Sequence, residues 1–131
     1  MTTLPQHFHR IRLNLARSKE FPDGSSRHGY EFVVPLDATG HIDTVLWKQH
    51  RALCTVRRIW AGEADLNGLL VHKAGGDRGG TWIFDYDGTS DFDDEAGYRF
   101  GAHAMQIGEY VSIKDEDGVL HTFIVTSLDA V

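Results

Sequence analysis

Carboxylates are concentrated in one segment of this chain, where six of them stand within residues 85–95. Hard cations such as Ca²⁺ take about six to eight oxygen ligands, so a loop this rich in carboxylates could enclose one. The spacing differs from that of an EF-hand loop beginning at Asp85, because Ser90 stands where the sharp-turn glycine belongs and Ala96 where the bidentate glutamate belongs. The alternatives are a solvated acidic loop and one paired with arginines. The candidate metal ligands are Asp85, Asp87, Asp91, Asp93 and Glu95.

Histidine is frequent, with eight in 131 residues. His72, His103 and His121 each fall in or next to a different expected strand, and three convergent imidazoles with a nearby carboxylate would suit zinc or iron. His7 and His9 are two residues apart and would point the same way on a strand, but no glutamate follows them on that strand to complete a site. The alternative for each histidine is an ordinary surface or core position.

The motifs for covalent catalysis and phosphate binding are incomplete. Cys54, the single cysteine, stands in an apolar stretch and is expected to be buried, and His50 four residues earlier does not complete a catalytic triad. Residues 75–80 are rich in glycine but lack the Lys-Ser/Thr pair of a P-loop. The sequence therefore favours a non-enzymatic protein without a cofactor. Acid–base chemistry by a buried Glu109 or Asp85 is the open alternative.

Contact with a partner is a second role for which the sequence offers candidates, because aromatic and arginine side chains are enriched at protein interfaces. Trp60 lies close to Arg58, and Trp82 would share one strand face with Tyr86. The alternative is that the aromatic side chains pack in the core, since they bury the largest apolar area per residue. The candidate surface residues are Arg57, Arg58, Trp60, Trp82 and Tyr86.

The chain is acidic overall, with a net charge of −6, but the charges are unevenly distributed. Residues 1–60 hold nine Lys and Arg against five Asp and Glu, a balance of +4, and residues 61–131 hold four against fourteen, a balance of −10. We expect the fold to interleave the two halves, so that most charges neutralise each other across neighbouring strands.

Overall acidity argues against nucleic acid as a partner, because neutralising phosphates requires a basic face. A local site built from Arg10, Arg12, Arg57 and Arg58 is the weaker hypothesis that remains. No apolar run approaches the roughly 20 residues of a membrane helix, and the N-terminal residues lack the apolar core of a secretory signal. We therefore expect a cytoplasmic protein that does not contact a membrane.

Strands are the elements that must position these residues. The clearest signal is a hairpin, because residues 108–114 and 119–125 alternate apolar and polar side chains on either side of the acidic turn at 115–118. A lone hairpin is marginal in water, so other strands must close around it. Asp43 could cap a short helix over 43–51. Alternation predicts further strands over residues 9–17, 30–36, 52–60, 69–72 and 81–86, with a shorter one at 98–100.

About seven short strands with at most one short helix predict an all-β fold, a small antiparallel barrel or sandwich formed by a single domain over residues 1–131. We favour the barrel, because closure removes the exposed edges that short strands would otherwise present. The main functional hypothesis is a non-enzymatic binding or protein-interaction module that contacts an unknown protein or a second copy of itself. The alternative is a barrel that binds a metal or small ligand through the acidic loop or the dispersed histidines, with or without enzymatic activity.

Overall fold

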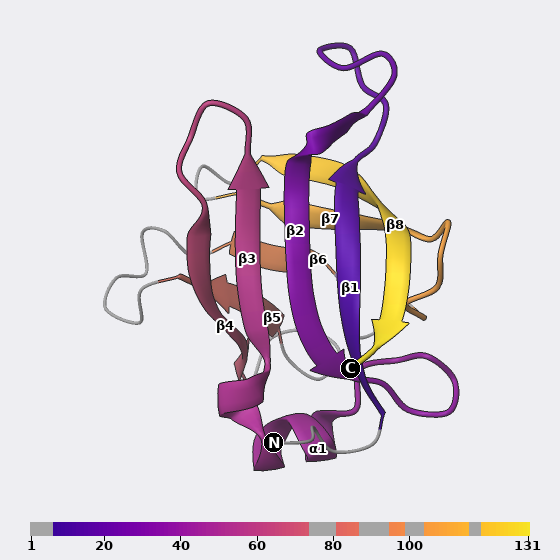
Figure 1. Ribbon diagram of the computed structural model, residues 1–131, viewed down its shortest axis with the longest axis vertical. Helices are drawn as coiled ribbons and strands as arrows, with labels where there is room; N and C mark the ends of the chain where they lie inside the picture. The colour runs from indigo at the N-terminus through magenta and orange to yellow at the C-terminus, as the bar shows by residue number, and fades with distance from the viewer. Residues whose placement is uncertain (1–6, 74–80, 87–94, 99–103, 116–118) are drawn as a thin grey trace.

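The chain folds into a closed antiparallel barrel in a computed structural model that describes residues 7–73, 81–86, 95–98, 104–115 and 119–131 (Figure 1). Each strand pairs with its neighbours in sequence, and β1 also pairs with β8, which closes the sheet. The described residues form eight strands, where the sequence predicted about seven, and the all-β barrel is confirmed. The strands are β1 (Phe8–Leu15), β2 (Ser25–Pro35), β3 (Thr55–Trp60), β4 (Leu66–Lys73), β5 (Thr81–Asp85), β6 (Glu95–Tyr98), β7 (Tyr110–Lys114) and β8 (Leu120–Ala130).

The sequential strand order keeps the two halves of the chain apart. Residues up to Trp60 form β1, β2 and β3, and the residues after it form β4 to β8, so strands of the two halves are paired in the described sheet only where β3 meets β4 and β1 meets β8. The expected interleaving is therefore wrong. An up-and-down barrel places each strand beside its sequence neighbours, and the charge asymmetry of the chain becomes an asymmetry between two walls.

The hairpin predicted near the C-terminus is present. β7 pairs with β8 from Tyr110↔Ile124 to Lys114↔Leu120. Within its turn, the carboxylate of Asp115 accepts hydrogen bonds from the backbone N–H of Val119 and from the His121 ring, each at 2.9 Å. β8 extends well beyond the predicted residue 125, because its second half pairs with β1 to close the barrel.

Alternation along the strands builds the core. The inward side chains include large rings in mutual contact, with the Tyr30 ring 5.1 Å from those of both Phe84 and Phe123 and the Phe32 ring 5.8 Å from that of Phe84. Packed aromatic rings stabilise such contacts beyond the area that they bury. The fully buried large side chains are Tyr30, Phe8, Phe32, Phe84, Phe123, Ile11, Leu13, Leu70, Met105, Ile113 and Val34.

A short helix lies across one end of the barrel, as Figure 1 shows, where the sequence predicted helical turns near 43–51. α1 (Thr44–Gln49) begins after Asp43, whose carboxylate accepts hydrogen bonds from two backbone N–H groups of its first turn, and the 3₁₀ turn η1 (Arg51–Leu53) follows it. Trp47 is the buried residue of α1, and its indole N–H donates to the Leu70 carbonyl at 2.9 Å. The helices described here are too short and polar to cross a membrane.

Candidate binding face on the outer wall of the barrel

A pocket of ≈ 320 Å³ opens on the outside of the barrel, over four consecutive strands. β1, β2, β3 and β4 stand side by side in Figure 1, and each contributes to the lining. The polar side chains around the pocket are Arg10, Glu31, Thr55, Arg57 and Asn67. We call these five residues, together with Arg12 beside them, the β1–β4 face.

Strand alternation and register bring this set together. Phe32 and Val56 are buried, so their neighbours along β2 and β3 face outward. The register then places Glu31 directly opposite Arg57, and Arg57 opposite Asn67 on the next strand. On its other side Glu31 pairs with Arg12 of β1. One carboxylate thus stands in a cross-strand row between two guanidinium groups.

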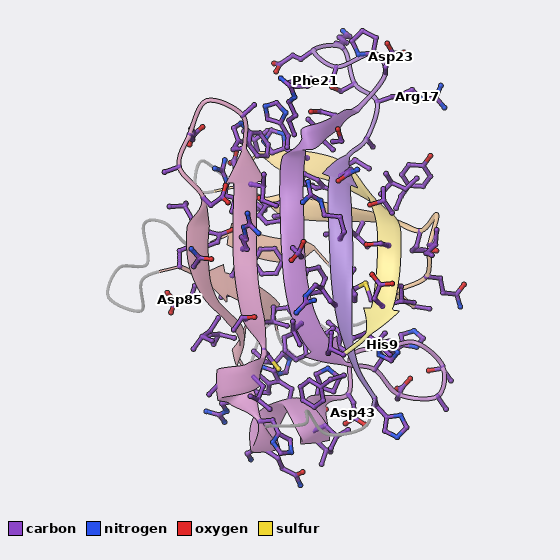
Figure 2. All side chains as sticks on the ribbon, viewed as in Figure 1. His9, Arg17, Phe21, Asp23, Asp43 and Asp85 are labelled. Carbon is purple, nitrogen blue, oxygen red and sulfur yellow. The ribbon has the colours of Figure 1, made fainter. Side chains whose placement is uncertain are left out.

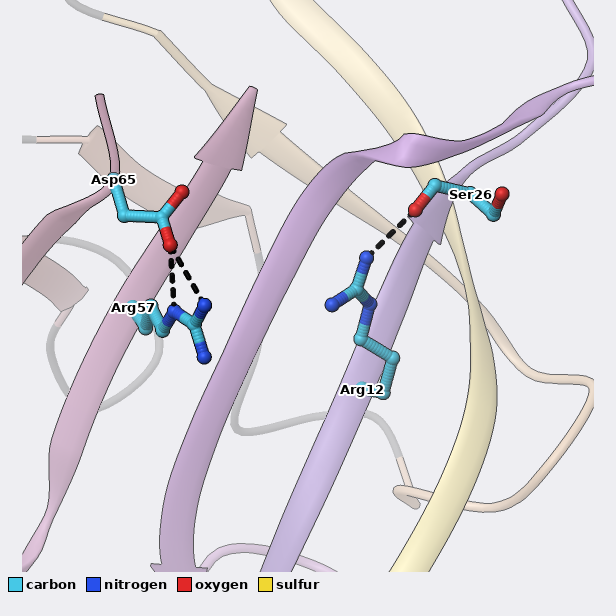
Figure 3. A network of polar contacts seen from close by, with 4 residues as sticks. All are labelled: Arg12, Ser26, Arg57 and Asp65. Atoms are coloured by element: carbon cyan, nitrogen blue, oxygen red, sulfur yellow. Dashed lines mark hydrogen bonds and ion pairs between the residues drawn. The ribbon is translucent and has the colours of Figure 1, made fainter. Parts of the chain in front are cut away.

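Arg57 is anchored firmly on the face. Its Nε and Nη2 atoms donate to one carboxylate oxygen of Asp65, at 2.9 and 2.7 Å, as Figure 3 shows. The hydrogen bond to Asp65, followed by the attraction of its charge, raises the pKa of Arg57 above its usual value. The side chain is still half exposed. Arg57 therefore carries its full charge at any physiological pH and keeps part of the guanidinium available to solvent.

Arg10 and Arg12 have weaker interactions with carboxylates than Arg57 has. The Arg10 Nε atom lies 3.8 Å from a Glu31 oxygen, beyond hydrogen-bonding distance, and the two side chains are 52% and 32% exposed. Exposed pairs of this kind stabilise a protein by only about 0–1 kcal/mol. Arg12 donates to the Ser26 carbonyl at 2.8 Å (Figure 3) and to the Asn14 side-chain oxygen, also at 2.8 Å, and forms no ion pair with any residue that the structure describes. Both guanidinium groups can therefore accept another anionic partner.

The predicted partner residues are divided between opposite sides of the sheet. Arg57 points outward, while the Arg58 side chain is only 16% exposed and its guanidinium lies 4.4 Å from the centre of the Trp60 ring. The Trp60 ring also contacts His28, at 4.6 Å, and His28 contacts Phe21 at 4.8 Å. This cluster lies at the end of the barrel near the β1–β2 loop, where Figure 2 labels Phe21, and it is separate from the β1–β4 face.

Trp82 and Tyr86 do not lie on a partner surface. They are 3% and 8% exposed and belong to the hydrophobic core. The Trp82 ring packs against Trp47 of the helix at 5.3 Å and against His72 at 4.4 Å. The expectation of a surface role is corrected for both residues, because Trp82 and Tyr86 lie at alternate positions in and just after β5 and their side chains are buried in the core.

The histidines of the predicted metal site lie in different surroundings. His72 packs against two tryptophan rings, His121 is 2.9 Å from the Asp115 carboxylate, and His103 lies outside the described residues. In the part of the chain that the structure describes, no three His, Cys, Asp or Glu side chains are placed to hold a metal ion. The histidine site therefore gains no support from the two members that are described.

The predicted acidic site falls mainly outside the described residues, which exclude Asp87, Asp91 and Asp93. Asp85 is the last residue of β5 and is partly exposed, at the side of the barrel in Figure 2, and Glu95 begins β6. The acidic cluster remains a sequence-based prediction.

Cys54 is fully buried, as the sequence predicted, and its thiol donates to the His50 carbonyl at 3.6 Å. Burial raises the pKa of the Cys54 thiol from an ordinary value of 9.0 to about 12. The thiolate is the nucleophilic form of cysteine, so a protonated, buried thiol is a packing residue.

Comparison with protein-family models, curated proteins and solved structures finds no match for this chain. A functional proposal for this chain therefore depends on its own geometry. Glu31, Thr55 and Asn67 are members of the β1–β4 face that sequence reasoning did not single out. Their outward position could be read from alternation, but their proximity depends on strand register.

Proposed function

We propose that this protein is a non-enzymatic binding module that contacts another protein through the β1–β4 face. The observation that carries the proposal is the pocket, because four strands of a closed sheet supply its charged and polar lining. Binding sites built on paired strands hold their side chains more precisely than sites on loops. The face offers such a site on the basic half of the chain.

The chemistry of the face suits recognition better than catalysis. Its most firmly held group, Arg57, has a raised pKa, so it cannot exchange a proton near neutral pH. Exposed guanidinium groups around a polar pocket instead favour electrostatic steering and choice of partner. Arginine is also among the residues enriched at protein interfaces. The proposal therefore assigns binding, and no bond-making step, to this face.

Affinity capture with matched charge variants tests the proposal. The immobilised wild-type protein, the R10A/R57A variant and a K48A/K114A control would be incubated with lysate from the source cell. Both variants lose two positive charges, but Lys48 and Lys114 are exposed on α1 and at the end of β7, away from the pocket. Thermal unfolding followed by circular dichroism would verify that both variants fold.

We expect one or more proteins to bind the wild type and the control but not the R10A/R57A variant. Equal capture by all three proteins would refute the proposed face. Equal loss of capture by both variants would show that net charge alone, and not the β1–β4 face, accounts for binding. Sedimentation at low and high salt would complete the test. A salt-sensitive dimer that R10A/R57A abolishes would make a second copy the occupant and overturn the proposal of a different partner protein.

A further inference from the structure

Four of the five polar side chains around the pocket, all except Glu31, can donate hydrogen bonds. The Arg10 side chain makes no hydrogen bond within the described part of the chain, and the Arg57 Nη1 atom takes no part in the contact with Asp65. The side chains of Thr55 and Asn67 line the same pocket, and neither hydrogen bonds to another described residue. A ligand that accepts several hydrogen bonds and carries negative charge would complement this set.

Glu31 is the one carboxylate in the lining, and it is weakly held. Its register neighbours on both sides are arginines, yet its ion pair among the residues described is the 3.8 Å contact with Arg10. The Glu31 side chain makes no hydrogen bond with a described residue. Guanidinium groups prefer two short parallel hydrogen bonds to a carboxylate, and Glu31 does not provide them to Arg10. Glu31 thus marks where a carboxylate would lie without satisfying the donors around it.

We propose that the pocket receives a carboxylate side chain from an acidic segment of the partner protein, and that this carboxylate displaces Glu31 from Arg10. The inference rests on the proposed function and specifies the chemistry of the partner. The incoming group would bond to Arg10 and to the free edge of Arg57, with Thr55 and Asn67 as further donors. Displacing a loose exposed contact costs little, because such a contact contributes little to stability.

A protein carboxylate fits this site better than a nucleic acid. The pocket, at ≈ 320 Å³, is at the small end of ligand sites and suits one side chain. A nucleic acid would extend across neighbouring surface, and the chain carries −6 overall, with −10 in the half that forms β4 to β8. A long polyanion is repelled by that wall, whereas a short acidic segment can be confined to the basic one.

Two kinds of substitution, one expected to weaken and one expected to strengthen peptide binding, test whether the pocket binds a carboxylate. A fluorescently labelled peptide with four glutamates spaced by serine would be titrated with the wild-type protein, with R10Q, R10K and E31Q, and with a K114Q control. Protein concentrations would extend into the millimolar range. Losing a hydrogen bond to a charged group weakens binding about tenfold, so R10Q should bind about tenfold more weakly. E31Q should bind more tightly, because it removes the competing carboxylate. R10K should remain weak, because lysine lacks the planar fork, and K114Q should match wild type.

The control peptide has glutamine in place of each glutamate and should not bind. Weaker binding by E31Q, or unchanged binding by R10Q, would overturn the inference, as would a single-stranded oligonucleotide that outcompetes the acidic peptide. The result also separates the two proposals. If capture of a partner still depends on Arg10 and Arg57 while the glutamate peptide does not bind, the carboxylate inference fails and the proposed function stands; if neither is observed, both fail.

Discussion

Replacing Gly68 with alanine should destabilise the barrel by about 3 kcal/mol, because cores and strand crossings tolerate added methyl groups poorly. A Cβ atom built at this position would lie 2.1 Å from the Asp85 carbonyl oxygen, 2.5 Å from the Tyr86 Cα atom and 2.7 Å from the Asp85 carbonyl carbon. All three are backbone atoms, so no side-chain rotation can relieve the overlap. β4 and β5 would have to separate where Gly68 now lets them approach.

The expected loss of stability follows from the number and kind of these contacts. Inserting a methyl group into a packed site usually costs about 1–3 kcal/mol, and three backbone overlaps place this substitution at or above the upper value. Because domains are stable by only about 5–15 kcal/mol, the loss is a large share of the total. For a chain of this size it corresponds to a fall in Tm of roughly 10 °C.

Urea denaturation followed by tryptophan fluorescence would measure the loss, with Gly62→Ala as the matched control. Gly62 has a φ of +83° but no heavy atom within 4 Å of a built Cβ. The control therefore reports only the strain of a left-handed alanine, about 1–2 kcal/mol. If Gly68→Ala destabilises the protein no more than Gly62→Ala, the close approach of β4 and β5 is not what requires glycine at residue 68.

Two further predictions concern buried groups. Trp47→Phe should cost about 1–3 kcal/mol in urea denaturation, because it removes the indole N–H that donates to the Leu70 carbonyl and leaves that acceptor unpaired; unchanged stability would show that the bond contributes nothing. Cys54 should react with a thiol reagent at pH 8 only as fast as the protein unfolds. The Cys54→Ala variant should lack the part of the pH dependence of stability that the thiol causes. Because the folded thiol has a raised pKa of about 12, its contribution is fully present below the unfolded value of 9.0 and is lost as pH rises between them. Stability measured across that window should therefore fall more steeply in wild type than in Cys54→Ala, and equal slopes would contradict the assignment.

The strands with strict alternation could be predicted from the sequence, and those shaped by tertiary contacts could not. β1 and β7 agree with the prediction to within two residues at each end, and β7 starts two residues late because Gly108 turns with a φ of +93° before it begins. β4 begins at Leu66, three residues before the strand predicted at 69–72, and the sequence did not reveal this start because Asn67 and Gly68 have low strand propensity. Pairing with β3 and β5 stabilises the start of β4 although its local strand propensity is low.

The candidate site was only partly predictable for a related reason. Alternation alone shows that the adjacent residues Arg57 and Arg58 must face opposite sides of a strand, although both were expected on one surface. That Glu31 lies opposite Arg57, 26 positions along the chain, is a property of register. Register depends on turn geometry and on which face is buried, and it is not visible in either strand taken separately.

Topology determines whether the charge asymmetry of the chain can be used for binding. The balance changes sign at residue 60, which is where β3 ends and the turn to β4 begins. If strands of the second half had been inserted between β1, β2 and β3, acidic and basic strands would alternate around the sheet and neutralise each other locally. The up-and-down order prevents this, because strands of opposite halves are paired in the described sheet only at the two seams between the walls. A basic face therefore exists on an acidic protein, and a partner that approaches it meets attraction on one wall and repulsion on the other. Such a field orients an acidic partner before contact, so raising the salt concentration should slow association more than it speeds dissociation.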